Sequence, residues 1–128
     1  MSQQMPLFAP ESKWSPPQNL PDLSSAKEIA VDLETHDPGL IIKGPGWATN
    51  TGEVVGVAVA TEGWSGYLPF KHQGGGNLEK DFVVNWLKKQ MATPSDKIFH
   101  NAMYDVGWLK RLGVEITGTI QDTMVAAP

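Results

Sequence analysis

Two carboxylates, Asp32 and Glu34, stand two residues apart at the end of the apolar run Ile29-Ala30-Val31. Side chains at positions i and i+2 of a strand point to the same face, so a strand here brings both carboxylates together. Like charges this close repel each other unless a cation lies between them. Carboxylates without nitrogen or sulfur ligands favour Mg²⁺ or Mn²⁺. Asp-x-Glu alone is also typical of a strand that simply runs out into solvent.

A third carboxylate belongs to the segment His100-Asn101-Ala102-Met103-Tyr104-Asp105. Asn101 and Asp105 are four residues apart, which places them on one face of a helix. At the start of such a helix, Asp105 can point back toward the strand ends and join the first two carboxylates. A helix cap for Asn101 and an acid favoured by the helix dipole for Asp105 remain open as alternatives.

The elements around these residues predict a mixed sheet flanked by helices, an α/β fold. A glycine- and proline-rich loop is expected over residues 35–52, and a tight turn at residues 62–63. The predicted strands are 29–34, 53–61, 64–70, 97–100 and 114–120. The predicted helices are 78–91 with Asn77 as its cap, 101–112, and one that starts after Asp122.

The N-terminal stretch differs in composition from the rest of the chain. Residues 1–22 hold five of the ten prolines, which block helices and cannot donate to a strand ladder. We expect an extended arm over 1–22, whose Phe8 and Trp14 can pack on the domain or on a partner, and one domain over 23–128.

The predicted helix 78–91 is expected to bury one apolar face. That face is formed by Phe82, Val83, Trp86, Leu87 and Met91.

Composition excludes several classes of protein. The 128 residues contain no cysteine, which rules out disulfides, zinc–cysteine sites and thiol nucleophiles. There is no apolar run of about 18 residues and no secretory signal pattern, so a cytoplasmic protein without a membrane span is expected. The net charge of −4 speaks against DNA binding by a simple basic patch.

Taken together, the motifs resemble a known family. Val31-Asp32-Leu33-Glu34-Thr35 looks like the first motif of the DEDD 3′–5′ exonucleases, and Phe99–Asp105 looks like the second, in which an Asn precedes the catalytic Asp by four residues. Leu109–Gly113 and Asp122–Ala127 are similar to later segments of the proofreading domain of family A, polymerase I-like DNA polymerases. The loop after the first motif is similar to that of phage members. The resemblance covers about residues 28–127 and implies an RNase H-like (DnaQ-like) fold.

This resemblance implies two-metal hydrolysis of 3′-terminal nucleotides to nucleoside 5′-monophosphates, with Mg²⁺ or Mn²⁺. Asp32 would bridge both ions, Glu34 would bind one ion and orient the water, and Asp105 would hold the other ion. The implied substrate is a single-stranded DNA 3′ end, and the bound ions offset the negative charge of the site. The residues expected to contact the substrate are Leu33, Thr35, His100, Asn101 and Trp108.

The resemblance also implies a fourth carboxylate, with a Tyr or His four residues before it, that these residues do not supply. Asp122 lies only 17 residues after Asp105 and is expected to be a helix cap. We therefore expect an N-terminal fragment that is poorly active alone, with a polymerase domain in the same parent chain, in the host cytoplasm if phage-encoded. A DEDD exoribonuclease and a non-catalytic single-strand-binding or scaffold module of a polymerase remain the alternatives.

Overall fold

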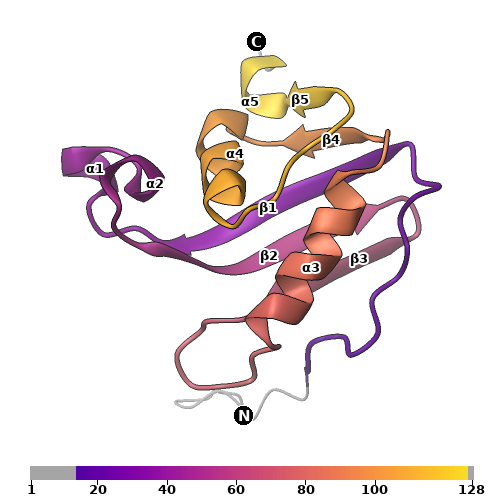
Figure 1. Cartoon of the computed structure of the whole chain (residues 1–128), viewed down its shortest axis with the longest axis horizontal. Coiled ribbons are helices and arrows are strands. Elements are labelled where there is room, and N and C mark those ends of the chain that lie inside the picture. Colours follow the sequence, from indigo (N-terminus) through magenta and orange to yellow (C-terminus); the bar gives the residue numbers. More distant parts are fainter. Residues whose placement is uncertain (1–13, 127–128) are drawn as a thin grey trace, which may run out of the picture.

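A five-stranded mixed sheet organises the chain in the computed structural model, which describes residues 14–126, with side chains described as far as Met124. The strand order is β3-β2-β1-β4-β5 (Figure 1). β1, β2 and β3 form an antiparallel meander, while β4 runs parallel to β1 and β5 parallel to β4. The strands are β1 Glu28–His36, β2 Glu53–Thr61, β3 Trp64–Pro69, β4 Asp96–Phe99 and β5 Ile120–Asp122. The predicted α/β class and mixed sheet are confirmed.

Two long helices accompany the sheet. α3 (Lys80–Met91) crosses one face of the β1–β3 meander, and α4 (Ala102–Arg111) follows β4 directly (Figure 1). The predicted loop 35–52 contains two one-turn helices, α1 (Leu40–Lys43) and α2 (Gly46–Thr49), and α5 (Thr123–Ala126) follows β5. No helix in the part of the chain described is long and apolar enough to cross a membrane.

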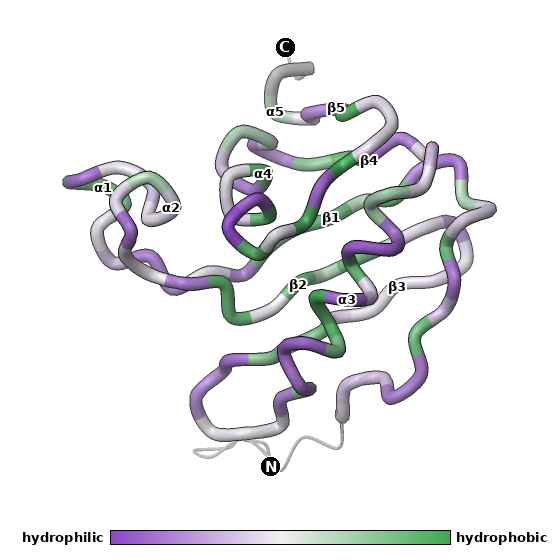
Figure 2. The backbone as a smooth tube through the Cα atoms, viewed as in Figure 1, coloured by the Kyte–Doolittle hydropathy of each residue, from purple (hydrophilic) through white to green (hydrophobic). Residues whose placement is uncertain are grey.

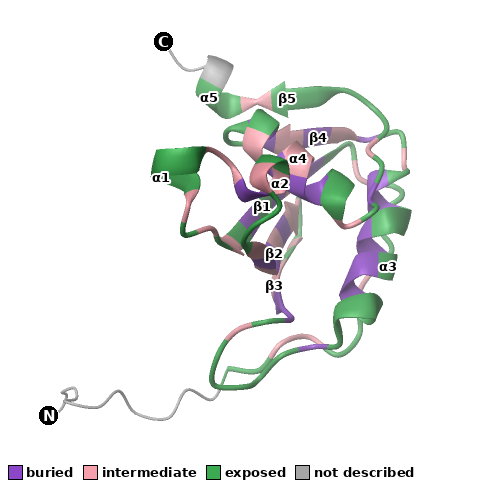
Figure 3. Ribbon diagram, turned by 60° about the vertical axis from the view of Figure 1, so that its left-hand side comes forward, coloured by how far each residue is buried: buried purple, intermediate pink, exposed green. Residues whose placement is uncertain are grey.

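The core lies between α3 and the covered face of the sheet. Alternate residues of β1 are buried, and so are several positions of α3 (Figure 3). Hydrophobic and hydrophilic residues alternate along these two elements (Figure 2). The predicted burial of the apolar face of α3 is confirmed at four positions. The prediction is wrong for Phe82, which is 41% exposed near the start of the helix. The fully buried side chains between the two layers include Ile29, Val57, Leu68, Val83 and Leu87.

Several boundaries differ by one or two residues from the sequence prediction, and two differences, at the start of α3 and at the last strand, have a visible cause. α3 begins at Lys80 with Glu79 as its cap residue, because the amide of Asn77 binds the backbone N–H and C=O of His72 instead. The last strand is Ile120–Asp122 rather than 114–120. Residues before it pack on the end of α3, where Thr117 donates from its backbone N–H to the Met91 carbonyl, and the chain then turns at Gly118 with a φ of +82°.

The described part of the N-terminal arm, residues 14–22, contains no helix or strand and is held against α3. The Trp86 indole donates to the Pro21 carbonyl (2.8 Å), and the Leu23 backbone N–H donates to the Gln90 side chain (2.7 Å). Trp14 lies beside Tyr67, with ring centroids 6.4 Å apart. Phe8 lies outside the described residues, and the boundary at residue 22 stays a prediction.

Candidate active site

The carboxylates of Asp32 and Glu34 lie on the face of β1 that is turned away from the α3 core. Both side chains are exposed, while Val31 and Leu33 between and beside them are buried. The pairing register between β1 and β2 shifts between Glu34 and Thr35. The extra residue at this shift is Val55 of β2, and such bulges bend the strand that carries them and are common next to active sites. The predicted placement of both carboxylates on one face is what the strand shows.

Asp105 reaches the same strand from α4. Its side chain is only 3% exposed, and its Oδ2 accepts the backbone N–H of Leu33 at 3.4 Å. The ladder between β1 and β4 extends only to the Ala30–Ile98 pair, so β4 no longer covers this edge of β1 at Leu33. A carboxylate from the first turns of α4 takes the place of the missing ladder partner. The second motif is thereby tied to the backbone of the first.

The electrostatic surroundings of Asp105 are unusual for a carboxyl group. Burial raises its pKa to about 6, the hydrogen bond from Leu33 opposes this shift, and the negative charges of Asp32 and Asp122 add to it. A buried carboxyl beside two further carboxylates disfavours its own ionised form. A divalent cation relieves that repulsion, so the donor chemistry of this corner fits Mg²⁺ or Mn²⁺.

These carboxylates have the chemistry that a divalent cation prefers, but they do not form a preformed binding site. Across residues 14–124, no three His, Asp or Glu side chains are grouped closely enough to hold one ion. Asp32 and Asp105 are near enough for the charge of one to raise the pKa of the other, while the charge of Glu34 acts on Tyr67 of β3. The three predicted ligands therefore surround one end of β1 without converging on a single point.

The predicted substrate residues have different surroundings. His100 is exposed, and its Nδ1 shares a hydrogen bond with the Thr123 hydroxyl (2.9 Å). Asn101 is exposed at the start of α4 with a φ of +71°, a left-handed conformation that Asn tolerates better than most residues. The Thr35 hydroxyl shares a hydrogen bond with that of Tyr104 (3.0 Å). Trp108 is 3% exposed and packs in the core, so its ring offers no surface for stacking.

Asp122 caps a helix, as predicted, although it caps more than the helix that follows it. Its Oδ1 accepts the backbone N–H groups of Asn101 and Met124, both at 2.9 Å, and its Oδ2 accepts that of Ala102 at 2.8 Å. The N-terminus of α4 thus rests on β5. This contact positions the turn from which Asp105 projects.

Asp37 is a structural partner of this corner that the sequence did not indicate. Its Oδ2 accepts the Tyr104 hydroxyl (2.7 Å) and the backbone N–H of Gly46 (3.0 Å). A Cβ at Gly46 would collide with the Thr51 carbonyl, so only glycine fits there. The loop after β1 is therefore fastened to α4 through one carboxylate. The sequence signal was weak because Asp-Pro-Gly reads as an ordinary turn.

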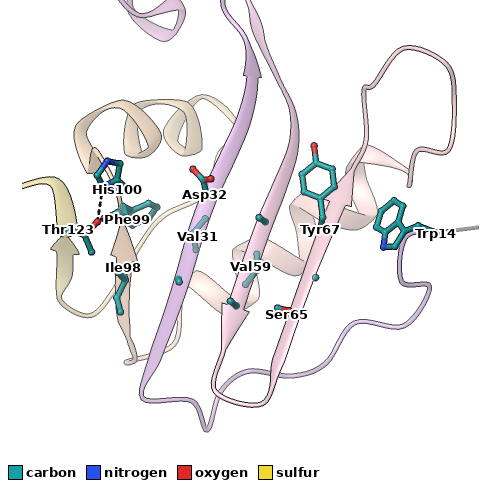
Figure 4. Close-up of a pocket in the computed structure, with 14 residues that line it drawn as sticks. Trp14, Val31, Asp32, Val59, Ser65, Tyr67, Ile98, Phe99, His100 and Thr123 are labelled. Atoms are coloured by element: carbon teal, nitrogen blue, oxygen red, sulfur yellow. Dashed lines mark hydrogen bonds between the residues drawn. The ribbon is translucent and has the colours of Figure 1, made fainter. Parts of the chain in front are cut away.

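A groove of about 650 Å³ lies on the open face of the sheet (Figure 4). Asp32 and His100 stand on one side of it and Tyr67 on the other, with Trp14 beyond Tyr67. Small residues of β2 form the floor between them. The groove is wide enough for a small organic ligand, and the carboxylate of Asp32 lines one side of it.

Comparisons with known proteins agree with this geometry. A family model described as 3′–5′ exonuclease, of the family A DNA polymerase type, matches residues 18–128. The chain is also 36% identical over 133 residues to a DNA-directed DNA polymerase of Pseudomonas phage M6. That alignment covers 98% of this chain and 20% of the polymerase. The chain thus spans about a fifth of the length of the relative that it matches.

Proposed function

We propose that this chain, which belongs to the 3′–5′ exonuclease domain family of family A DNA polymerases, removes 3′-terminal nucleotides from single-stranded DNA ends during proofreading. The observation that carries the proposal is the buried carboxyl of Asp105, bonded to the Leu33 backbone between the carboxylates of Asp32 and Glu34. The DNA polymerase named above supports a polymerase domain in the same parent chain as the partner. Residence in a host cytoplasm stays a prediction.

The proposed metal ligands are Asp32, Glu34 and Asp105. When bound, two divalent cations, Mg²⁺ or Mn²⁺, supply charge neutralisation and an activated water for in-line displacement. Asp32 would hold both ions, Glu34 one ion together with the water, and Asp105 the ion at the leaving 3′-oxygen. The protein contributes the fixed direction of Asp105, because the Leu33 bond and the Asp122 cap of α4 both orient it.

For the substrate we propose contacts from Leu33, Thr35, His100 and Asn101. The Thr35 hydroxyl already bonds with Tyr104, so its contribution to a nucleotide comes from the backbone. Asn101 and His100 are exposed where β4 gives way to α4, beside the groove. We leave Trp108 out of this group because its ring is buried.

The decisive experiment compares two activities in a polymerase that carries this domain. Asp32→Ala should lower 3′–5′ hydrolysis of a single-stranded DNA oligonucleotide by about 10³-fold, as expected when a preorganised charge at the reacting phosphate is lost. Polymerisation should stay within about twofold. Asp81→Ala is the matched control, since Asp81 is an exposed carboxylate on α3 away from the site.

The alternatives give different results in the same assay. An exoribonuclease would degrade a single-stranded RNA oligonucleotide faster than the DNA of the same sequence. A non-catalytic module would bind the DNA end but release no nucleotide in either variant. An unchanged hydrolysis rate in Asp32→Ala would remove the central assignment.

A further inference from the structure

Residues that are paired across β1, β2 and β3 form rows on the open face of the sheet, and two of these rows matter here. Asp32 pairs with Ala58, and Ala58 pairs with Tyr67. Directly paired residues of antiparallel strands share a face, so Tyr67 stands on the same face as Asp32. Strands are about 4.8 Å apart, which puts the two backbones roughly 10 Å apart with only a methyl group between them. Figure 4 shows Asp32 and Tyr67 on either side of β2.

The second row brings the phenol of Tyr67 toward Glu34. Glu34 pairs with Gly56, and a Cβ at Gly56 would collide with the hydroxyl and ring of Tyr67. The glycine therefore lets the phenol lie across β2 in the row of Glu34. Burial and the negative charge of Glu34 both raise the pKa of Tyr67, which keeps its hydroxyl protonated as a neutral donor.

A second side chain fixes the phenol. The Tyr67 hydroxyl is hydrogen-bonded to Nε2 of His72. His72 is itself held by the Asn77 amide, which binds its backbone N–H at 2.8 Å and its carbonyl at 2.9 Å. In the tautomer with a proton on Nε2, the imidazole donates to the phenol oxygen, and the phenol's own proton is left for a ligand.

The groove between these walls offers few polar side chains, among them Asp32 on one side and Tyr67 on the other. The described residues that line it include no Lys or Arg. Anionic ligands here depend on cations held at β1 and on neutral donors elsewhere. Tyr67 is the neutral donor opposite Asp32, across the small side chain of Ala58, which lines the groove between them.

We infer that Tyr67, oriented by His72, is a further substrate-positioning residue of this site and donates a hydrogen bond to a phosphate oxygen of the 3′-terminal nucleotide. The inference rests on the proposed exonuclease function. It assigns a substrate contact to the side of the groove opposite the carboxylate of Asp32. His72 acts through Tyr67 and does not itself touch the nucleotide.

The test measures binding of thymidine 5′-monophosphate to the 128-residue chain in Mn²⁺ by titration calorimetry. Tyr67→Phe removes only the hydroxyl, and it should weaken binding about tenfold, the value of one hydrogen bond to a charged group. His72→Ala should weaken binding about threefold, and the double variant should be no weaker than Tyr67→Phe, because both act through one hydroxyl. Thr61→Val, which removes a hydroxyl at the hairpin end of β2, is the control and should bind as the wild type does.

Thymidine without its phosphate separates positioning from packing. Its affinity should be the same for the wild type and Tyr67→Phe, whereas a packing role would weaken nucleoside and nucleotide alike. Equal nucleotide affinity in the two proteins, an equal loss for both ligands, or no nucleotide binding by the wild type each overturns the inference. The proposed function fails separately, if Asp32→Ala leaves hydrolysis by the parent polymerase intact.

Discussion

The two faces of the sheet are made by alternate residues of the same strands, and they are held in different ways. On the face under α3, Ile29, Val31 and Val57 are nearly or fully buried. On the other face, Asp32 and Glu34 are exposed, and Asp32 lines the groove. Apolar burial stabilises the first face, while the second keeps close carboxylates that burial would penalise. Substitutions on the first face should therefore change stability, and those on the second face should change ligand binding and catalysis.

On β4 the distribution is partly the opposite, with a charged residue on the covered face and an apolar residue on the open face. Lys97 points to the covered face and is fully buried, whereas its neighbour Ile98 lines the groove on the open face. The ammonium group donates to the carbonyls of Thr93 (2.5 Å), Ser95 (2.7 Å) and Thr117 (2.7 Å). It thus joins the turn after α3 to the segment that leads to β5. A buried cation here has the structural role that apolar contacts have elsewhere on this face.

Replacing Lys97 on the covered face should cause the largest change in the free energy of unfolding. Lys97→Met keeps the side-chain length but removes the ammonium donor. The Thr93 carbonyl still accepts the Thr117 hydroxyl, whereas the Ser95 and Thr117 carbonyls lose the donor described above, and each unsatisfied buried group costs about 1–3 kcal/mol. We expect the free energy of unfolding to fall by about 4 kcal/mol in urea titrations. Lys88→Met, at an exposed position of α3, should change it by less than about 0.5 kcal/mol. Equal stability of the two variants would mean that the Ser95 and Thr117 carbonyls find water instead.

A smaller effect compares an apolar side chain from each side of the sheet. Leu87 of α3 is fully buried, and Leu87→Ala should lower the free energy of unfolding by about 3 kcal/mol. Ile98 is only partly buried on the open face, so Ile98→Ala should cost less than about 1.5 kcal/mol. Denaturant unfolding measures both. Similar losses would show that the open face contributes to the core as much as the covered face does.

The sequence predicted the features that depend on local patterns. The apolar run Ile29-Ala30-Val31 indicated β1, the valines of residues 53–61 indicated β2, and the spacing within the two motifs predicted that Asp32, Glu34 and Asp105 lie around one strand end. These predictions work because strand geometry alone fixes which side chains share a face.

The misses depend on contacts between segments distant in the sequence. Asn77 binds His72 rather than α3, and Val114, predicted as strand, packs in the core without joining the ladder. Trp108 looked available on a helix face, but the loop after β1 and Tyr104 cover it. No local pattern marks Tyr67 and Glu34 as neighbours, because Gly56, on the strand between them, decides it.

The last predicted effect is a gain in stability rather than a loss, and it concerns Asp105. Its pKa is about 6 in the folded chain, against 3.8 for an ordinary Asp. Because the folded pKa is the higher one, the stability that Asp105 contributes is complete below about pH 4 and is lost as the pH rises through 6. Asp105→Asn keeps an oxygen that accepts the Leu33 N–H and carries no charge. In EDTA at pH 7.5, this variant should be more stable than the wild type by about 2 kcal/mol.

Urea unfolding at pH 4 and pH 7.5 checks this prediction, and the gain of Asp105→Asn should vanish at the lower pH. Asp81→Asn, an exposed carboxylate on α3, should show no pH-dependent difference from the wild type. Mn²⁺ should stabilise the wild type at pH 7.5 more than it stabilises Asp105→Asn, since a cation that binds the folded state favours the ionised carboxylate. A wild type and Asp105→Asn whose stabilities run parallel from pH 4 to 7.5 would mean that the Asp105 carboxyl ionises as an ordinary surface acid. The site would then lack the strained carboxyl that a metal ion is proposed to relieve.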